Sequence, residues 1–427
     1  MKIYRYPQKE EWARIMKRPQ IDSGDLTELV IQLLNDIRNR GDEALFAYEL
    51  KYDKVALTSL RVTDHELDKA ESLLPTELKE AIRTAAQNIE KFHASQVVEE
   101  KRIETTDGVV CWQKQVGIDR VGLYVPGGTA PLFSTVLMLG IPARIAGCSQ
   151  RILCSPPNQK GEIHPAILFA AKVAGINEIY KLGGVQAIGA MAYGTESVPK
   201  VYKIFGPGNQ YVTMAKQLVS LRDVAIDMPA GPSEVEIIAD GDSNPAFAAS
   251  DFLSQAEHGA DSQSLLLTSD ETFIELFTRE VELQLNQLPR KDLASKSLQN
   301  SKVVLLRNDK EILDFTNEYA PEHLIIQSTN YNTLAMQIRN AGSVFLGPYT
   351  PESAGDYASG TNHTLPTNGY AKSYSGVNLD SFTRKITFQE ISAAGLNELG
   401  PVIEIMAENE LLQAHKNAVT IRLESIK

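Results

Sequence analysis

The sequence has few of the residues that build disulfide scaffolds or bind nucleic acids. Three of its 427 residues are cysteines (Cys111, Cys148 and Cys154), and the absence of a CxxC pair favours a reducing compartment over disulfide bonds. Lysine and arginine total 42 against 54 aspartates and glutamates, which gives a net charge of -12. Because this charge would repel a phosphate backbone, it argues against nucleic acids and acidic membranes as partners.

A long uninterrupted apolar run is also missing. The most apolar stretch, residues 121–147, is broken by prolines and glycines and contains Arg144, so it predicts buried structure and not a membrane span. The amino terminus lacks the apolar core of a secretory signal. The length and the 43% of hydrophobic residues suit two or three domains. We therefore expect a cytoplasmic protein that does not contact a membrane.

What the chain does contain is a repeated order of strand, Gly/Pro turn and helix. This order predicts an α/β fold with parallel sheets flanked by helices. In the middle of the chain the expected strands are 120–125, 151–154, 178–182 and 203–205, and the expected helices begin near 133, 164 and 186. After Pro232 the expected strands are 235–239, 264–268, 302–306, 323–327 and 343–346. Elsewhere we expect amphipathic helices at 25–40 and 76–92, strand at 103–115, and a helical tail from about 382.

Three glycine-rich turns follow the strands of the middle region. They are PGGTAP at 126–131, GGVQAIG at 183–189 and FGPGNQY at 205–211. Open parallel sheets bind ligands beyond the carboxyl ends of their strands, where glycines let a ligand approach the backbone and helix N-termini favour negative charge. None of the three is GxGxxG, no Walker motif is present, and each alone could be a tight turn. Together they predict the rim of a cofactor site.

Some of the seven histidines stand in polar company. Gln255 and His258 are three residues apart in a helical stretch, so they share a helix face and could hold a metal. The polar, glycine-rich segment 351–369 carries Asp356 and His363, and we expect it to be a functional loop. Near the tail, Glu410 and His415 lie on a polar helix, where a solvated face is the alternative. We interpret His65, His93 and His164 as surface or hydrogen-bonded residues without a functional role.

Glu322 and His323 are adjacent at the point where a turn enters an apolar strand. Histidine there can be a general base of near-neutral pKa, and glutamate beside it can activate water. Such a pair suits a reaction with both an alcohol to deprotonate and a water to activate. Taken with the residues above, it favours a zinc-assisted active site.

Long segments of the chain, in the same order, resemble the histidinol dehydrogenase family from about Arg120 to His415. The matching segments are RVGLYVPGGTAPLFSTVLMLGIPARIAGC, KIFGPGNQYV, AIDMPAGPSEV, SDFLSQAEHG, YAPEHLII, GSVFLG, PESAGDYASGTNHTLPT and AHKNAVTIR. The resemblance implies two large α/β domains with incomplete Rossmann-like sheets and small terminal segments exchanged within a homodimer. The expected division is an N-terminal segment at 1–22, a catalytic domain at 23–119 with 230–378, an NAD-binding domain at 120–229, and a C-terminal helical tail at 379–427.

The resemblance also implies roles for individual residues. One zinc ion per subunit would be held by Gln255, His258 and Asp356 together with His415 of the partner subunit. Substrate would contact these metal ligands and also Ser233, His323, His363 and Glu410. NAD would lie against Tyr124, Gln186 and Asn209.

The implied reaction is the two-step oxidation of L-histidinol through L-histidinaldehyde to L-histidine, the last steps of histidine biosynthesis. His323 would take the hydroxyl proton, Glu322 would activate water for the second step, and two NAD would accept hydride while zinc orients the substrate. A cysteine thiohemiacetal is the alternative to water, but the cysteines resemble packing residues. Two other classes stay open: a zinc hydrolase that needs no NAD, and a two-domain ligand-binding protein.

Overall fold

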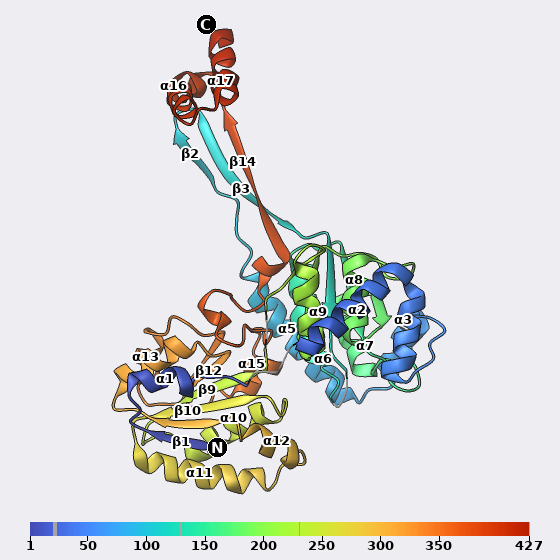
Figure 1. The fold of residues 1–427 in the computed structure, drawn as a ribbon, viewed down its shortest axis with the longest axis vertical. Helices are drawn as coiled ribbons and strands as arrows, with labels where there is room; N and C mark the ends of the chain where they lie inside the picture. The colour runs from blue at the N-terminus through green and yellow to red at the C-terminus, as the bar shows by residue number, and fades with distance from the viewer. Residues whose placement is uncertain (20–23, 128–129, 230, 427) are drawn as a thin grey trace. The chain divides into compact units, whose positions relative to one another are not determined.

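Three β-sheets organise the chain (Figure 1), which the computed structural model describes at residues 1–19, 24–127, 130–229 and 231–426. Residues 1–95 and 118–382 form one unit, which contains both parallel sheets, and residues 96–117 and 383–427 form a second, smaller unit. Within the described residues, no helix has the length and apolar character needed to cross a bilayer.

The smaller parallel sheet follows the middle of the chain. Its five strands lie in the order β6 (Glu178–Lys181), β5 (Gln150–Ser155), β4 (Arg120–Tyr124), β7 (Lys203–Phe205) and β8 (Ala225–Ile226). One face packs on α5 (Thr76–Ala94), α6 (Phe133–Ile145) and α7 (Pro165–Ala174). The other face packs on α2 (Gly24–Arg40), α3 (Asp42–Tyr48), α8 (Gly184–Tyr193) and α9 (Gln210–Ser220).

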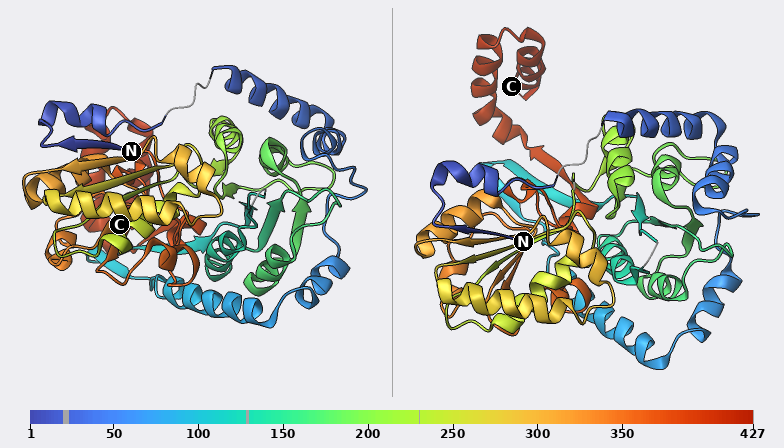
Figure 2. Two further views of the ribbon diagram at one scale, coloured as in Figure 1. Left: turned by 90° about the horizontal axis from the view of Figure 1, so that it is seen from below. Right: turned by 60° about the horizontal axis from the view of Figure 1, so that its bottom comes forward.

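The larger parallel sheet has six strands with helices on both faces (Figure 2). The order is β1 (Lys2–Arg5), β11 (Lys302–Leu305), β10 (Gln263–Thr268), β9 (Glu234–Ile238), β12 (His323–Ile326) and β13 (Ser343–Leu346). β9, β10, β11 and β12 are buried along their whole length, and each contains two or three consecutive apolar residues, as expected for strands covered on both faces. The helices around this sheet are α1 (Lys9–Ile15), α10 (Pro245–Ala256), α11 (Glu271–Leu285), α12 (Lys291–Ser297), α13 (Asp309–Tyr319) and α14 (Tyr331–Ala335).

The two parallel sheets share one strand order. In each, the chain places two successive strands on one side of its first central strand and then returns to the other side. The direction therefore reverses between β4 and β7 in the smaller sheet, and between β9 and β12 in the larger one. Ligands of open α/β sheets bind at such reversal points, so these two places are where sites are expected.

The second unit is an antiparallel sheet with two helices. Its strands are β14 (Thr383–Ile391), β3 (Val109–Gly117) and β2 (Arg102–Thr106), and its helices are α16 (Ala393–Asn409) and α17 (Gln413–Ile426). The prediction of a helical tail from about 382 is therefore wrong over its first nine residues. They form β14 because they pair with β3, which lies far away in the sequence.

Two further predictions differ from the structure. The segment expected to be one loop, 351–369, begins with α15 (Glu352–Tyr357). The helices between residues 24 and 94 pack on the smaller sheet, so residues 23–119 do not group with 230–378 as expected. An amphipathic pattern shows which helix face is buried but not which sheet buries it. By contrast, the α/β fold with parallel sheets is confirmed.

Candidate active site

Glu322 and His323 lie at the amino end of β12, beside the amino end of β9. In the sheet register, His323 is paired with Val235 of β9. Ser233 Oγ donates a hydrogen bond of 2.7 Å to Glu322 Oε2, and the backbone N–H of Glu234 donates one of 2.9 Å to the same oxygen. Burial raises the pKa of Glu322 to about 7. A carboxylate poised near neutrality suits a general base.

The His323 ring is buried among carboxylates. Its Nδ1 is 3.6 Å from Glu352 Oε1 and 3.7 Å from Glu322 Oε2, and its Nε2 is 3.6 Å from Asp356 Oδ1. Burial alone would lower the pKa of His323, but these three carboxylates outweigh it and raise the pKa to about 10. The ring therefore keeps its proton unless positive charge close by offsets the carboxylates.

Three side chains beside this ring have the arrangement of metal ligands. One ligand atom from each of His258, Glu352 and Asp356 lies within 4.8 Å of the other two. His258 follows the end of α10, and α15 supplies both acids. Ser254 of α10 donates a 3.4 Å hydrogen bond to Glu352, so the end of α10 and the start of α15 are in contact.

Gln255, the next residue of α10, has a fully buried side chain. Within the described residues, neither its amide oxygen nor its amide nitrogen has a hydrogen-bond partner. A buried amide without partners costs free energy unless something absent from the structure binds it. This observation, together with the cluster of His258, Glu352 and Asp356, fits a metal ion.

His363 connects the site to the smaller sheet. Its Nδ1 is 2.9 Å from the backbone oxygen of Asp356, and its Nε2 is 3.0 Å from Thr135 Oγ1 on α6. Next to it, Asn362 donates a 2.6 Å hydrogen bond to the backbone oxygen of Met138, also on α6. The segment after α15 is therefore held against the helix that follows the PGGTAP turn.

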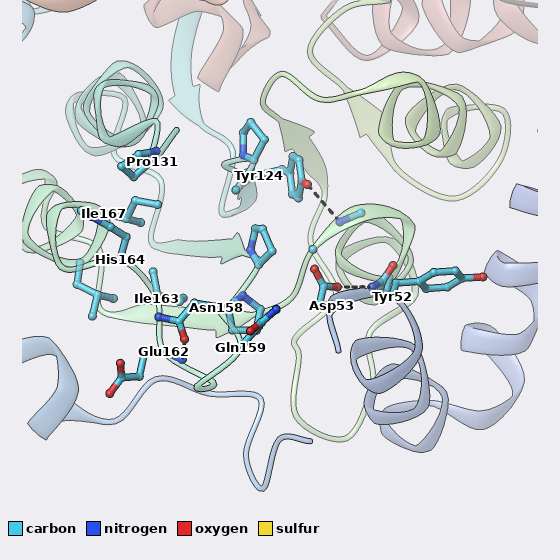
Figure 3. Close-up of a pocket in the computed structure, with 18 of the residues that line it drawn as sticks. Tyr52, Asp53, Tyr124, Pro131, Asn158, Gln159, Glu162, Ile163, His164 and Ile167 are labelled. Atoms are coloured by element: carbon cyan, nitrogen blue, oxygen red, sulfur yellow. Dashed lines mark hydrogen bonds between the residues drawn. The ribbon is translucent and has the colours of Figure 1, made fainter. Parts of the chain in front are cut away.

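A cavity of about 1210 Å³ lies at the carboxyl edge of the smaller sheet (Figure 3). Tyr124, Gln186 and Asn209 line it, and so do residues of all three glycine-rich turns. The opposite wall comes from α2, from the π-helix η1 (Glu49–Asp53) and from α4 (Asp64–Ser72). The prediction that these turns surround a common site is supported by this cavity, whose size suits a cofactor.

The predicted residues that the structure brings together are Ser233, His258, Glu322, His323, Asp356 and His363. Glu410 ends α16 and His415 lies on α17, both in the second unit, so their predicted contribution to the site stays a prediction. His93 is buried, and its Nδ1 contacts the backbone oxygen of Ile89, while its Nε2 has no hydrogen-bond partner within the described residues. His65 and His164, also expected to have no role, line the cavity.

Sequence reasoning missed Glu352. This residue is almost fully buried, and its Oε1 faces His323 without a hydrogen-bond partner within the described residues. Glu352 precedes Asp356 by four residues, so on a helix the two share a face. The spacing of the two acids is visible in the sequence, but it points to a shared face only once the segment is known to be a helix.

The cysteines lie outside both clusters. Cys148 and Cys154 are buried in the core around the smaller sheet, and burial raises the pKa of the Cys148 thiol to about 11 and that of Cys154 further. A thiolate nucleophile is therefore disfavoured at both positions. Cys111 belongs to β3 of the second unit.

Comparisons with known proteins agree over the whole chain. A sequence model of the family described as histidinol dehydrogenase matches residues 16–423. Histidinol dehydrogenase from Bacteroides thetaiotaomicron is 63% identical over 427 residues, with 100% of both chains covered, and the one from Salmonella typhimurium is 50% identical over 421 residues, with 98% of this chain and 96% of that one covered. The crystal structure of histidinol dehydrogenase from Elizabethkingia anophelis is 55% identical and matches with a TM-score of 0.98, covering 100% of this chain and 98% of that chain. The chain therefore belongs to the histidinol dehydrogenase family, oxidoreductases that oxidise histidinol in histidine biosynthesis.

Proposed function

We propose that this site oxidises L-histidinol through L-histidinaldehyde to L-histidine, with NAD as hydride acceptor and one zinc ion per subunit. The observation that carries the proposal is the juxtaposition of the Glu322–His323 pair with the metal-type donors His258, Glu352 and Asp356. Beside them, the buried amide of Gln255 and Oε1 of Glu352 have no hydrogen-bond partner within the described residues. A hydrolase would use the same donors but would not need the cavity at the carboxyl edge of the smaller sheet.

Zinc would be held by Gln255, His258 and Asp356, with His415 of the partner subunit as the fourth ligand. When bound, zinc would supply a centre that orients the imidazole and amino nitrogens of the substrate, and NAD would supply the acceptor for both oxidations. The unpartnered amide of Gln255 and the ligand atoms of His258 and Asp356 fit this assignment.

His323 is the base of the first oxidation. Its Nε2 has no hydrogen-bond partner within the described residues, so this nitrogen is free to accept the hydroxyl proton as the carbinol carbon is oxidised. The ring can do so only when the surrounding negative charge is offset, as by a cation on Asp356 and His258.

Glu322 acts in the second oxidation. Ser233 and the Glu234 backbone hold one of its oxygens, which fixes the carboxylate at the amino end of β12. From there Glu322 takes a proton from the water that attacks the aldehyde carbon, and the resulting hydrate is oxidised to the carboxylate. Water is favoured over a cysteine nucleophile because Cys148 and Cys154 are buried in the core with raised pKa values.

We also propose a homodimer in which Glu410 and His415 of one subunit complete the site of the other. Exposed large apolar side chains gather on α16, α17 and the turn between them (Val402, Ile405, Met406, Leu411, Leu412 and Ile421). A patch of this kind on a small unit favours coverage by another protein surface.

Residues 120–229, which carry the smaller sheet, would be the NAD-binding domain.

The proposal is tested by measuring NADH formation from L-histidinol with the purified protein, before chelation, after chelation and after zinc is restored. Two NADH per histidinol, lost with the chelator and recovered with zinc, would support the reaction and both cofactors. A folded, zinc-loaded protein that forms no NADH would contradict the proposal, and hydrolysis without NAD would then be assayed.

A further inference from the structure

Two carboxyl groups stand at the cavity of the smaller sheet where a dinucleotide site would be expected to receive phosphate. Both come from the π-helix η1: Glu49, which begins it, is fully buried, and Asp53, which ends it, lines the cavity. π-helices are rare and are frequently found at functional sites. Neither residue belongs to the catalytic cluster described above.

Glu49 occupies the N-terminus of α8. Its Oε1 accepts a 3.3 Å hydrogen bond from the backbone N–H of Gly183, and the next N–H, of Gly184, donates 3.1 Å to the hydroxyl of Tyr124. In dinucleotide-binding folds, N–H groups at such a helix start hold phosphate. Here they are taken by side chains, so a phosphate group is not expected at this helix start.

Gln186 links the two acids. Its amide nitrogen donates to Glu49 at 3.2 Å and to Asp53 at 3.3 Å, and the second contact is drawn in Figure 3. Both amide hydrogens are thereby used, so the side chain offers a ligand only its oxygen, which accepts hydrogen bonds. With the Asp53 carboxylate, this corner of the cavity presents acceptors and suits hydroxyl or amino groups.

Burial, together with the neighbouring Asp53, raises the pKa of Glu49 to about 8. Asp53 is half-buried and lines the cavity, and burial raises its pKa as well. Lys69 is the only lysine or arginine among the described residues that line the cavity, and it lies on α4. Among the described residues, the cavity lining therefore offers no arginine to receive an additional phosphate.

The position of Asp53 indicates which part of NAD it would contact. The nicotinamide end must approach the catalytic cluster, and Pro131 is the part of the cavity lining that precedes helix α6, whose Thr135 contacts His363. In Figure 3 Asp53 lies below Tyr124 and apart from Pro131, which leaves it the adenosine end. Many sheets of this strand order use an acid after the second strand to bind the adenosine ribose. Here that strand, β5, is followed by Pro156 and Pro157.

We propose that Asp53 binds the 2′-hydroxyl of the adenosine ribose of NAD and, with Glu49 behind it, excludes the 2′-phosphate of NADP. The inference rests on the proposed use of NAD. It makes Asp53 a residue that determines cofactor specificity, supplied by an N-terminal helix and not by the sheet.

The test compares kcat/KM for NAD and for NADP at saturating L-histidinol in the wild type, Asp53→Asn and Asp53→Ser. Loss of a hydrogen bond to a charged group raises KM for NAD by about tenfold or more, while removal of the charge relieves repulsion of NADP. The preference for NAD should fall by at least about tenfold in both variants, with kcat at saturating NAD nearly unchanged. Asp68→Asn is the matched control: its side chain is exposed on α4, outside the cavity lining, and the preference should stay as in the wild type.

An unchanged preference in both Asp53 variants, with wild-type melting temperatures, would overturn the inference. A wild-type protein that forms no NADH from histidinol would instead contradict the proposed function. In that case equilibrium binding of NAD and NADP to the same variants still decides the role of Asp53: a wild-type preference for NAD that is lost in both variants supports it, and equal binding of the two nucleotides by the wild type refutes it.

Discussion

Replacing Glu322 with glutamine should separate the two oxidations. Glu322 Oε2 accepts hydrogen bonds from Ser233 Oγ at 2.7 Å and from the Glu234 N–H at 2.9 Å. The carbonyl oxygen of glutamine can accept both, and the two side chains have nearly the same shape. Glu322→Gln therefore preserves the local packing and removes only the capacity to take up a proton.

We expect Glu322→Gln to lower the rate of aldehyde oxidation. A positioned general base contributes about 10²- to 10⁴-fold to a rate, which corresponds to about 3–5 kcal/mol of activation free energy. Histidinol oxidation, for which His323 is the proposed base, should stay within a few-fold of the wild type. NADH formed per histidinol should therefore fall from two towards one, and histidinaldehyde should be trapped as an adduct with a carbonyl reagent.

The pH profile gives a second readout. Because burial raises the pKa of Glu322 to about 7, the carboxyl must lose its proton to act as a base. The rate of histidinaldehyde oxidation by the wild type should fall about tenfold per pH unit below this pKa and level off above it. In Glu322→Gln this slope should be absent. Glu318→Gln, an exposed position on α13, is the control. Histidinaldehyde oxidation at the wild-type rate by Glu322→Gln would refute the role assigned to Glu322.

Three further predictions concern stability, the metal and the dimer. Glu236 is fully buried, and burial raises its pKa from 4.5 to about 8. Between these two pH values the folded state keeps a proton that the unfolded state has lost. The free energy of unfolding of the wild type therefore falls by about 1.4 kcal/mol per pH unit as the pH rises. Glu236→Gln should remove this pH dependence, so in denaturant titrations its free energy of unfolding should gain about 2–3 kcal/mol on that of the wild type as the pH rises from 6 to 8. Parallel pH profiles of the two proteins would contradict this expectation. Gln255→Ala should weaken zinc binding by about tenfold or more in chelator competition, since it deletes a proposed ligand, and unchanged affinity would remove Gln255 from the metal site. Mixing His415→Ala with a variant altered only at Glu322 and His323 should restore activity in mixed dimers, and no recovery would count against a shared site.

Local sequence signals were sufficient for much of the fold. The strands β9 to β12, which are buried along their whole length, fall within or beside the strands expected from the sequence at 235–239, 264–268, 302–306 and 323–327. The glycine-rich turns predicted one shared cavity because carboxyl ends of parallel strands meet at one edge, and Tyr124, Gln186 and Asn209 all line it. The NAD assignments of these three residues came from the family resemblance and remain proposals.

Features that depend on distant pairing could not be predicted. β14 is exposed and polar for most of its length, and its strand conformation depends on β3, which lies more than 250 residues earlier in the chain. The contact of Glu49 and Asp53 with Gln186 exists only because the helices of residues 24–94 pack on the smaller sheet. An acidic pair in an amphipathic region gives no local sign of that contact.

The two parallel sheets have the same strand order but place their sites at opposite edges. The cavity lies at the carboxyl edge of the smaller sheet, as the general rule for open sheets requires, whereas Glu322 and His323 lie at the amino edge of the larger one. The rule therefore locates the cavity and fails for the proposed catalytic pair. Helix α6 connects the cavity with the proposed catalytic residues, because it follows the first glycine-rich turn and its Thr135 contacts His363. If hydride passes from one place to the other, this contact should be sensitive to substitution even though Thr135 touches neither the catalytic pair nor the metal-type donors within the described residues. Thr135→Val, which keeps the shape and deletes the hydroxyl, should then lower kcat for both oxidations while leaving zinc content unchanged.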